Sequence, residues 1–248
     1  MILMIDWGNT QLKILKCDLL TQESLVQGEQ FRVDGVAQLV QLLDENYQHI
    51  LVASVRNEQD NNQLRHLLQT KSASLFFAKT SPEACGVSCG YQNYQLLGVD
   101  RWLGLIAVAS AEQTVGLISI GTAITLDIIT DKQHMGGHIV PGRRLMFESL
   151  LNTGQVRPAV SESLKFDVQL GHSTSDCVNF GIDAAINGYL QSIIESLESK
   201  YQIKHWVLTG GGGKYWYDQL KTTSAHYSHN PFVVFIGLVK LYLKSLNN

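Results

Sequence analysis

Residues 1–14, MILMIDWGNTQLKI, decide the fold that we expect for this chain. An apolar run ends on a single acid, Asp6, and the small residues Gly8–Thr10 follow before apolar residues resume at Leu12. This order predicts a buried strand, a tight polar turn and a second strand. Backbone N–H groups of such a turn can cradle phosphate oxygens, and a neighbouring carboxylate can hold Mg²⁺ directly or through water. The alternative is an ordinary hairpin with an exposed aspartate.

A second copy of this layout lies in the middle of the chain, at residues 117–129, LISIGTAITLDII. Aligning Gly8 with Gly121 places Asn9 opposite Thr122, and each turn is flanked by apolar runs. Internal repeats often determine a whole fold. Two such units predict two similar lobes with a nucleotide between them, a layout that resembles the actin, Hsp70 and sugar-kinase superfamily.

Composition limits the class of protein. The chain has 248 residues, of which 45% are hydrophobic and 17% charged, and its net charge is −3. These values are typical of a soluble globular protein, and the absence of a basic run argues against nucleic acid and membrane surfaces as partners. No apolar run is long enough to span a bilayer, and Met1–Ile5 lacks the basic lead of a signal peptide. We therefore expect a cytoplasmic protein, with Cys85 and Cys89 as free thiols rather than zinc ligands.

The pattern of apolar residues predicts an α/β protein of two similar RNase H-like lobes, as in actin-like ATPases, each a mixed sheet flanked by helices. The nucleotide cleft would lie between lobes formed by residues 1–112 and 113–248. In the first lobe we expect strands at 2–5, 12–17, 25–33, 49–55 and 74–78, and helices at 36–45, 61–68 and 99–111. In the second we expect strands at 115–120, 125–129, 135–140 and 205–208, helices at 143–151, 175–199, from 214 and from 231 to 246, and a loop at 153–163.

Glycine-bearing turns follow three predicted buried strands, at Gly8–Thr10, Gly121–Ala123 and Gly210–Gly213. None has the spacing of a Walker A loop or of a dinucleotide-binding fingerprint. A single turn of this kind is usually only a turn. Three of them in two repeated lobes favour a cleft that binds a nucleotide.

A fourth candidate feature is Tyr91, followed by Gly98-Val99-Asp100-Arg101 at the start of a predicted helix. A helix N-terminus stabilises an ionised acid, and the planar guanidinium of Arg101 offers a fork for a carboxylate. The simpler interpretation is that Asp100 caps the helix beside a surface charge pair.

The motifs DWGNT, GVDRW, GTAITLD, GGHIVPG and LTGGGGKY, in this order, resemble those of type III pantothenate kinase. The resemblance covers nearly the whole chain. It implies a two-lobed actin-like fold, a homodimer, and ATP-dependent phosphorylation of pantothenate to 4′-phosphopantothenate, the first step of coenzyme A biosynthesis.

The resemblance also assigns residues to roles. It implies that Asp100 is the catalytic proton acceptor and that Mg²⁺ lies near Asp6, directly or through water. The implied ATP-binding residues are Asp6, Trp7, Gly8, Asn9, Thr10, Gln11, Leu12, Lys13 and Thr122, and the implied pantothenate-binding residues are Tyr91, Gly98, Val99, Asp100, Arg101 and Thr174. The chemistry agrees, because phosphoryl transfer depends mainly on positioning and on electrostatic stabilisation, and a carboxylate can accept the hydroxyl proton. Arg101 would either bind the substrate carboxylate or orient Asp100.

Two positions depart from the family pattern. Members that bind a monovalent cation carry an acid where this chain has Ser119, which puts a potassium or ammonium site in question. The family's Thr-x-x-Ala reads Thr174-Ser175-Asp176-Cys177 here. Thr174 remains our choice for the substrate threonine, with Ser173 as the alternative.

Two other functions compete with this interpretation. Relatives of the family resemble accessory factors that assist transcription, and the same fold carries sugar kinases and polyphosphatases. The joint presence of Asp6, Asp100 and Arg101, without a basic patch, favours an enzyme over a regulator. A sugar site would need several hydroxyl-binding acids and amides rather than one Tyr and one Arg.

Overall fold

The structure, a computed structural model, describes residues 1–43, 46–151, 169–220 and 226–247. The predicted loop at 153–163 lies outside the described residues. Contacts divide the chain into unit 1 (Met1–Ala111, Ile129–Gly136 and Phe232–Asn248) and unit 2 (Glu112–Ile128 and Gly137–Pro231). The predicted lobes, 1–112 and 113–248, stay a prediction. The contacts place the last helix and the 129–136 segment with unit 1.

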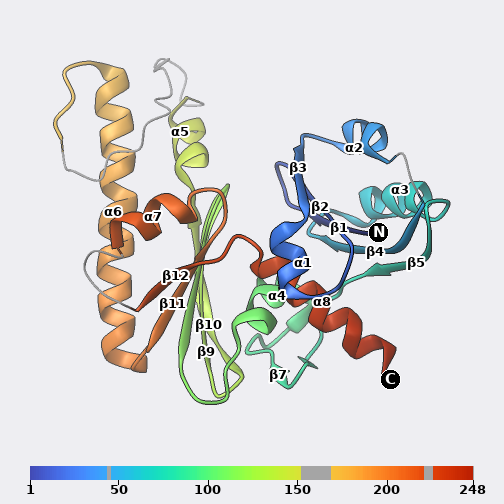
Figure 1. Ribbon diagram of the computed structural model, residues 1–248. Coiled ribbons are helices and arrows are strands. Elements are labelled where there is room, and N and C mark those ends of the chain that lie inside the picture. Colours follow the sequence, from blue (N-terminus) through green and yellow to red (C-terminus); the bar gives the residue numbers. More distant parts are fainter. Residues whose placement is uncertain (44–45, 152–168, 221–225, 248) are drawn as a thin grey trace. The chain divides into compact units, whose positions relative to one another are not determined.

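Unit 1 contains a five-stranded sheet in the order β3-β2-β1-β4-β5 (Figure 1). The β1–β2 and β2–β3 pairs are antiparallel, whereas β1–β4 and β4–β5 are parallel. The strands are β1 (Ile2–Trp7), β2 (Leu12–Cys17), β3 (Glu29–Val33), β4 (Tyr47–Ser54) and β5 (Ser72–Phe77). The helices are α1 (Gln22–Gln27), α2 (Val36–Leu42), α3 (Glu58–Leu68), the 3₁₀ turn η1 (Tyr94–Leu96), α4 (Val99–Val108) and α8 (Val233–Leu246).

Strand β1 is buried on both faces. Ile2 and Met4 belong to one apolar cluster and Leu3 and Ile5 to another, as the alternation of side chains along a strand requires. A central strand covered on both sides is apolar throughout, which explains the unbroken run at the N-terminus. The polar residues that follow β1 are therefore held at the end of a rigid, central element.

Unit 2 is built on the strands β12-β11-β8-β9-β10, in this order, and its described residues form three helices. The parallel pairs β8–β11 and β11–β12 lie next to each other. The strands are β8 (Val115–Ile120), β9 (Ala123–Thr130), β10 (Gln133–Pro141), β11 (His205–Thr209) and β12 (Tyr227–His229), and the helices are α5 (Arg143–Leu151), α6 (Thr174–Tyr201) and α7 (Gly213–Leu220). The end of β9 and the start of β10, within Ile129–Gly136, belong to unit 1. There Gln133 pairs with Ser88 of the short strand β7 (Val87–Ser88), and β7 pairs with β6 (Glu83–Ala84). The expected mixed α/β architecture with two sheets is confirmed.

One predicted strand, 25–33, is wrong over its first part. The structure has helix α1 before β3, and the side chain of Thr21 accepts a hydrogen bond from the Ser24 N–H at 3.3 Å. Such an N-cap, with Glu23 in the first turn, stabilises a helix start. Val26 is exposed and Leu25 is buried, so a single apolar side chain anchors this short helix.

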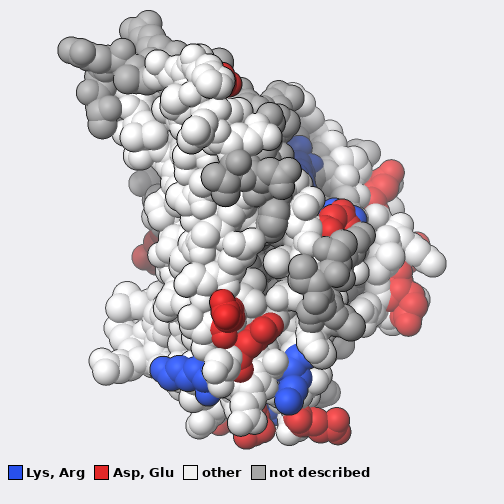
Figure 2. All heavy atoms as spheres, turned by 90° about the vertical axis from the view of Figure 1, so that its left-hand side faces the viewer, with Lys and Arg blue, Asp and Glu red and all other residues white. Residues whose placement is uncertain are grey.

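Helix hydropathy and surface charge bear on the expectations from composition. Within the described ranges, no helix is both long enough and apolar enough to cross a membrane. On the face shown in Figure 2, basic and acidic atoms form small mixed groups among uncharged atoms.

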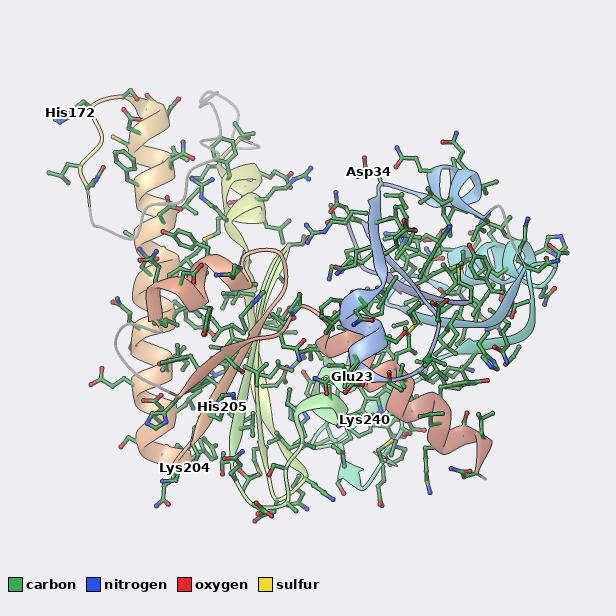
Figure 3. The ribbon with its side chains drawn as sticks, viewed as in Figure 1. Glu23, Asp34, His172, Lys204, His205 and Lys240 are labelled. Carbon is green, nitrogen blue, oxygen red and sulfur yellow. The ribbon has the colours of Figure 1, made fainter. Side chains whose placement is uncertain are left out.

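Helices α4 and α8 pack closely within unit 1 (Figure 1). A Cβ atom at Gly237 of α8 would overlap the carbonyl oxygen of Leu103 on α4. Lys240, labelled in Figure 3, donates to the carbonyl oxygens of Ile106 and Ala107 at 3.2 and 3.0 Å, near the C-terminal end of α4. A lysine that bonds the last carbonyls stabilises a helix end. The close packing against α8 therefore fixes the position of α4 within unit 1.

We predict that Gly237→Ala destabilises the protein by about 1–3 kcal/mol, because a new methyl group must displace backbone in a packed core. The matched control is Gly188→Ala in α6, where no atom lies within 4 Å of the added methyl group. The control should raise stability by about 0.5–1 kcal/mol, since alanine favours a helix interior. Urea unfolding of both variants measures the difference, and equal stabilities would contradict the packing.

Candidate active site

The first glycine turn follows β1 directly and is closed by backbone. The Gly8 N–H donates to the carbonyl oxygen of Gln11 at 3.1 Å. The Gln11 side chain donates to Asp34, labelled in Figure 3, at 3.1 Å. The Leu12 side chain is fully buried in the core, so only its backbone can contact a ligand. The turn is therefore a compact loop with a defined shape.

Asp6 and Lys13 form an ion pair beside this turn. They lie opposite each other on the antiparallel strands β1 and β2, and Lys13 Nζ lies 3.0 Å from Asp6 Oδ2. The Asp6 side chain is 7% exposed and that of Lys13 is 42% exposed. The acid is thus nearly enclosed while its partner reaches solvent. The strand pairing places Lys13 on the same side of the sheet as Asp6.

Arg56, which the sequence analysis missed, braces the same turn. Its Nη1 donates to the carbonyl oxygen of Asn9 at 3.1 Å, and its guanidinium carbon lies 5.6 Å from the centre of the Trp7 ring. Asp60 of α3 holds the guanidinium through Nε at 2.9 Å. Arg56 follows β4 and is distant from the turn in sequence. No local pattern could have revealed it.

The GVDR segment begins α4, as predicted. Gly98 is the N-cap, and Asp100 lies in the first turn, where Oδ1 accepts the Arg101 N–H at 2.8 Å. The Val99 side chain packs in the core, so its backbone alone faces the site. The short intrahelical bond fixes the direction of the Asp100 carboxyl.

Arg101 and Tyr91 are brought together as expected. Arg101 Nη1 donates to the Tyr91 hydroxyl at 2.7 Å, and the Arg101 guanidinium carbon lies 5.4 Å from the centre of the tyrosine ring. The ring of His134, another residue missed from sequence, stacks on Tyr91 at 5.8 Å between centroids and 18° between planes. His134 is buried on β10. Arg101 is therefore held by an aromatic side chain that is itself held by a second ring.

Electrostatics join the two motifs of unit 1. Burial raises the pKa of the Asp100 carboxyl above its usual range, and the negative charge of Asp6 raises this pKa further. The backbone hydrogen bond from Arg101 and the positive charges of Arg101 and Lys13 oppose the rise in pKa. Asp6, Lys13 and Asp100 thus share one electrostatic environment. A carboxyl with a raised pKa beside a specific charged partner is a typical proton-transfer group.

Unit 2 contains the other two glycine turns, and they touch each other. The Gly121 N–H donates to the Ala123 carbonyl oxygen at 3.0 Å, and the Gly212 N–H donates to the Ile120 carbonyl oxygen at 2.9 Å. The Gly142 N–H donates to the Thr122 carbonyl oxygen at 2.9 Å. The GGHIVPG motif therefore contributes its last glycine to the turn that carries Thr122.

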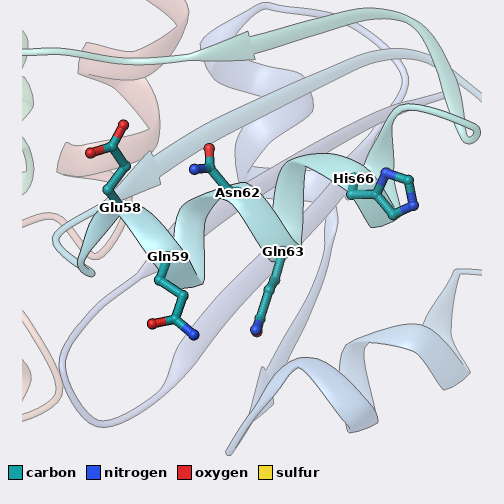
Figure 4. Close-up of a pocket in the computed structure, with 5 residues that line it drawn as sticks. All are labelled: Glu58, Gln59, Asn62, Gln63 and His66. Carbon is teal, nitrogen blue, oxygen red and sulfur yellow. The ribbon is translucent and has the colours of Figure 1, made fainter.

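A cavity of about 220 Å³ lies beside these turns, entirely within unit 2. Its lining includes Gly121, Ile124, Arg143, Asp183, Gly212 and Trp216. It combines apolar walls with a buried ion pair. A wider hollow of about 780 Å³ lies along α3, but exposed polar side chains line it and no glycine turn borders it (Figure 4).

Thr174, its alternative Ser173, and Ser119 are not among the residues that line the cavity of unit 2. Thr174 is the first residue of α6 and is exposed. Ser173 is the N-cap, and its Oγ accepts from the Asp176 N–H at 3.1 Å and donates to Asp176 Oδ2 at 2.8 Å. Ser119 lies on β8, half-buried, opposite Thr209 of β11.

Comparison with solved structures identifies the class of protein. A Baf family transcriptional activator from Campylobacter jejuni is similar over 99% of this chain and 100% of its own, with a TM-score of 0.62 and 21% identity. A protein described as an N-acetylmannosamine kinase from Listeria monocytogenes is similar over 99% of both chains, with a TM-score of 0.51 and 13% identity. These likenesses show the actin-like ATPase fold that sugar kinases share.

Sequence comparison then identifies the family. The family model for type III pantothenate kinase matches residues 2–196. A type III pantothenate kinase of Acinetobacter baylyi is 33% identical over 84% of this chain and 85% of its own. The chain belongs to the type III pantothenate kinase family.

We predict that Asp100→Asn is more stable than the parent at pH 7, by on the order of 1 kcal/mol or about 2–4 °C in Tm. The parent must hold an ionised carboxylate in a partly desolvated site that also feels the charge of Asp6, whereas asparagine keeps the oxygen that accepts the Arg101 N–H. Because the pKa of Asp100 is higher in the folded than in the unfolded state, the cost is fully present above the folded pKa and is lost as the pH falls from there toward the unfolded pKa. The advantage of the variant should therefore shrink on acidification. Thermal melts from pH 4 to pH 7 would test this, and a less stable variant at pH 7 would contradict it.

Proposed function

We propose that this protein transfers the γ-phosphoryl group of ATP to pantothenate, giving 4′-phosphopantothenate for coenzyme A biosynthesis. The observation that carries the proposal is the Asp100 carboxyl, which is half-buried, is held by the Arg101 N–H and has a pKa that desolvation and the charge of Asp6 raise. Family membership supports the same substrates. A regulator without an active site would have no use for this costly arrangement.

ATP binding is assigned to Asp6, the Gly8–Thr10 turn, Lys13 and Thr122. Backbone N–H groups of the turns and the Lys13 ammonium would meet the phosphates. Asp6 is a single, nearly enclosed carboxylate, and that suits Mg²⁺, which retains several waters and needs few protein ligands. Mg²⁺ would neutralise charge on the phosphates. The cavity of unit 2 has the volume and the apolar walls to take the base.

Pantothenate binding is assigned to Tyr91, Gly98–Arg101 and Thr174. The Arg101 guanidinium, oriented by Tyr91, would meet the pantothenate carboxylate, while the Arg101 backbone N–H orients Asp100. The sequence left open whether Arg101 binds the substrate carboxylate or orients Asp100. In this proposal its guanidinium does the first and its backbone N–H does the second. Ser173 is engaged as the helix cap, which favours Thr174 as the substrate threonine.

The reaction needs one proton acceptor. Asp100 would accept the proton of the primary hydroxyl of pantothenate as its oxygen bonds to the γ-phosphorus, and the bond to the β-phosphate oxygen would break to release ADP. The raised pKa brings this base closer to the operating pH, where proton transfer is most effective.

We predict that ADP release requires pantothenate. Purified protein in a coupled ADP assay with ATP and Mg²⁺ should be nearly inactive with water alone and with simple sugars, and active when pantothenate is added. The appearance of phosphopantothenate by mass spectrometry confirms the acceptor. Equal ADP release with and without pantothenate would refute the proposal, and stimulation by a sugar would favour another kinase of this fold.

We further predict that Asp100→Asn lowers turnover by about 10²–10⁴-fold and leaves nucleotide binding nearly unchanged, since only the proton acceptor is lost. In the parent, kcat/KM should fall on acidification at a pH above the usual Asp range, because Asp100 must be ionised to act. The residual activity of the variant should lack this acid limb. Turnover within a few-fold of the parent would remove Asp100 from the role.

The monovalent cation is a separate proposal. Ser119 offers a neutral hydroxyl where a carboxylate would be a stronger ligand for a hard cation. We predict weak dependence on potassium or ammonium, and a stronger dependence in Ser119→Asp. Titration of potassium chloride against sodium chloride at constant ionic strength tests this, and a steep saturable requirement in the parent would contradict it.

Location and assembly complete the proposal. We infer a cytoplasmic homodimer, on the family resemblance alone. Light scattering after size-exclusion chromatography measures the assembly.

A further inference from the structure

A row of buried polar side chains lies on α6, the long helix of unit 2. Asn179, Asp183 and Asn187 follow one another at intervals of four residues and are 4%, 5% and 7% exposed. Residues four apart lie on one face of a helix. Apolar side chains of the same helix, among them Ile182 and Ile186, belong to the core of unit 2. Buried polar groups are costly unless they are bonded, so this row needs an explanation.

Arg143, the first residue of α5, supplies it for two of the three, Asn179 and Asp183. Arg143 Nε donates to Asp183 Oδ1 at 2.7 Å, and Arg143 Nη2 donates to Asn179 Oδ1 at 2.9 Å. The side-chain amide of Asn179 in turn donates to the Ser175 carbonyl oxygen at 2.7 Å. The Arg143 side chain is only 16% exposed. One guanidinium thus bridges two acceptors a helical turn apart, a two-point contact that lysine cannot reproduce.

The residue before Arg143 is packed against the second phosphate turn. The Gly142 N–H donates to the Thr122 carbonyl oxygen, and a Cβ atom at Gly142 would overlap the carbonyl oxygen of Gly121. Gly142 also accepts the Met146 N–H at 3.0 Å, so it is tied to the first turn of α5. The position of the α5 N-terminus therefore determines the position of the Gly121–Thr122 turn.

We infer that Arg143 and Asp183 are positioning residues for nucleotide binding, because their buried ion pair fixes the α5 N-terminus and, through Gly142, the Gly121–Thr122 turn. This rests on the proposed function, in which that turn meets the phosphates. Preorganised sites depend on side chains that lock the binding groups from behind. The pair also has an electrostatic role: Arg143 neutralises Asp183, which would otherwise present an unpaired carboxylate in the cavity that borders the turn.

Two variants and one control test the inference. Arg143→Gln removes the charge and the two-point contact. Removing one partner of a buried pair can unfold a protein, whereas replacing both by apolar residues is often tolerated, so Arg143→Met/Asp183→Leu is the second variant. The control, Ser149→Ala, removes an exposed hydrogen bond on the same helix, from Ser149 Oγ to the Met146 carbonyl oxygen, and Ser149 does not line the cavity. Each protein is studied by calorimetric titration with a non-hydrolysable ATP analogue and Mg²⁺, by pantothenate KM, and by hydrogen exchange without nucleotide.

We expect both variants to bind the analogue about 10- to 100-fold more weakly, the loss typical of a small misplacement of binding groups. The pantothenate KM should stay within about twofold, and exchange should rise in residues 141–146 but not in β11. The control should match the parent in all three measurements. If Arg143→Gln does not fold, the analogue affinity and hydrogen exchange of Arg143→Met/Asp183→Leu test the inference.

The outcomes separate the two proposals. A parent that does not bind the analogue refutes the proposed function, while the exchange data, which need no nucleotide, still judge the positioning. A parent that binds, with the double variant binding equally well and exchanging equally slowly at 141–146, overturns the inference. Loss of analogue affinity together with uniformly faster exchange throughout unit 2 also overturns it, since the pair would then support only general stability.

Discussion

The repulsion between the buried Asp6 carboxylate and the half-buried Asp100 carboxyl is the interaction on which the proposed chemistry of unit 1 depends. Two carboxylates in one enclosed environment repel each other, and each loses hydration. Lys13 pairs with Asp6 across the β1–β2 ladder, and the first turn of α4 supplies an N–H to Asp100. Neither compensation is complete, because the pKa of Asp100 remains raised. The rest of the unit, from the doubly buried β1 to the α4–α8 contact, holds the two acids in place against this cost.

The glycine turns impose a second constraint, in unit 2. A phosphate-binding turn needs exposed backbone N–H groups, and so it cannot be held by bulky side chains on the ligand side. The structure holds the Gly121 turn from behind with backbone, through Gly142 and the α5 N-terminus. A buried ion pair then fixes α5 to α6. Burying polar groups in a core costs free energy. In our inference, this buried pair positions the Gly121–Thr122 turn for nucleotide binding.

The neighbours show why the fold alone does not assign a function. A transcriptional activator and a sugar kinase share this architecture with the chain. Many functions occupy one fold, and side chains at the site separate them. Asp100, Arg101 and Tyr91 form one hydrogen-bonded group, and in our proposal this group binds pantothenate. The family membership and the geometry of this group support the same proposal.

The sequence by itself determined the apolar strands, the three glycine turns and the helix that begins at the GVDR motif, because each follows from local order and spacing. The resemblance of its motifs to a known family indicated the family. It did not reveal α1, where one capping threonine outweighed a strand-like run. It did not reveal Arg56, His134 or the Arg143–Asp183 pair, since these contacts join residues that are far apart in the chain: 47 positions separate Arg56 from Asn9, and 40 separate Arg143 from Asp183. Nor did it reveal that α8 packs on α4 through Gly237 within unit 1. Local patterns encode elements and turns, and only tertiary packing decides which distant side chains meet.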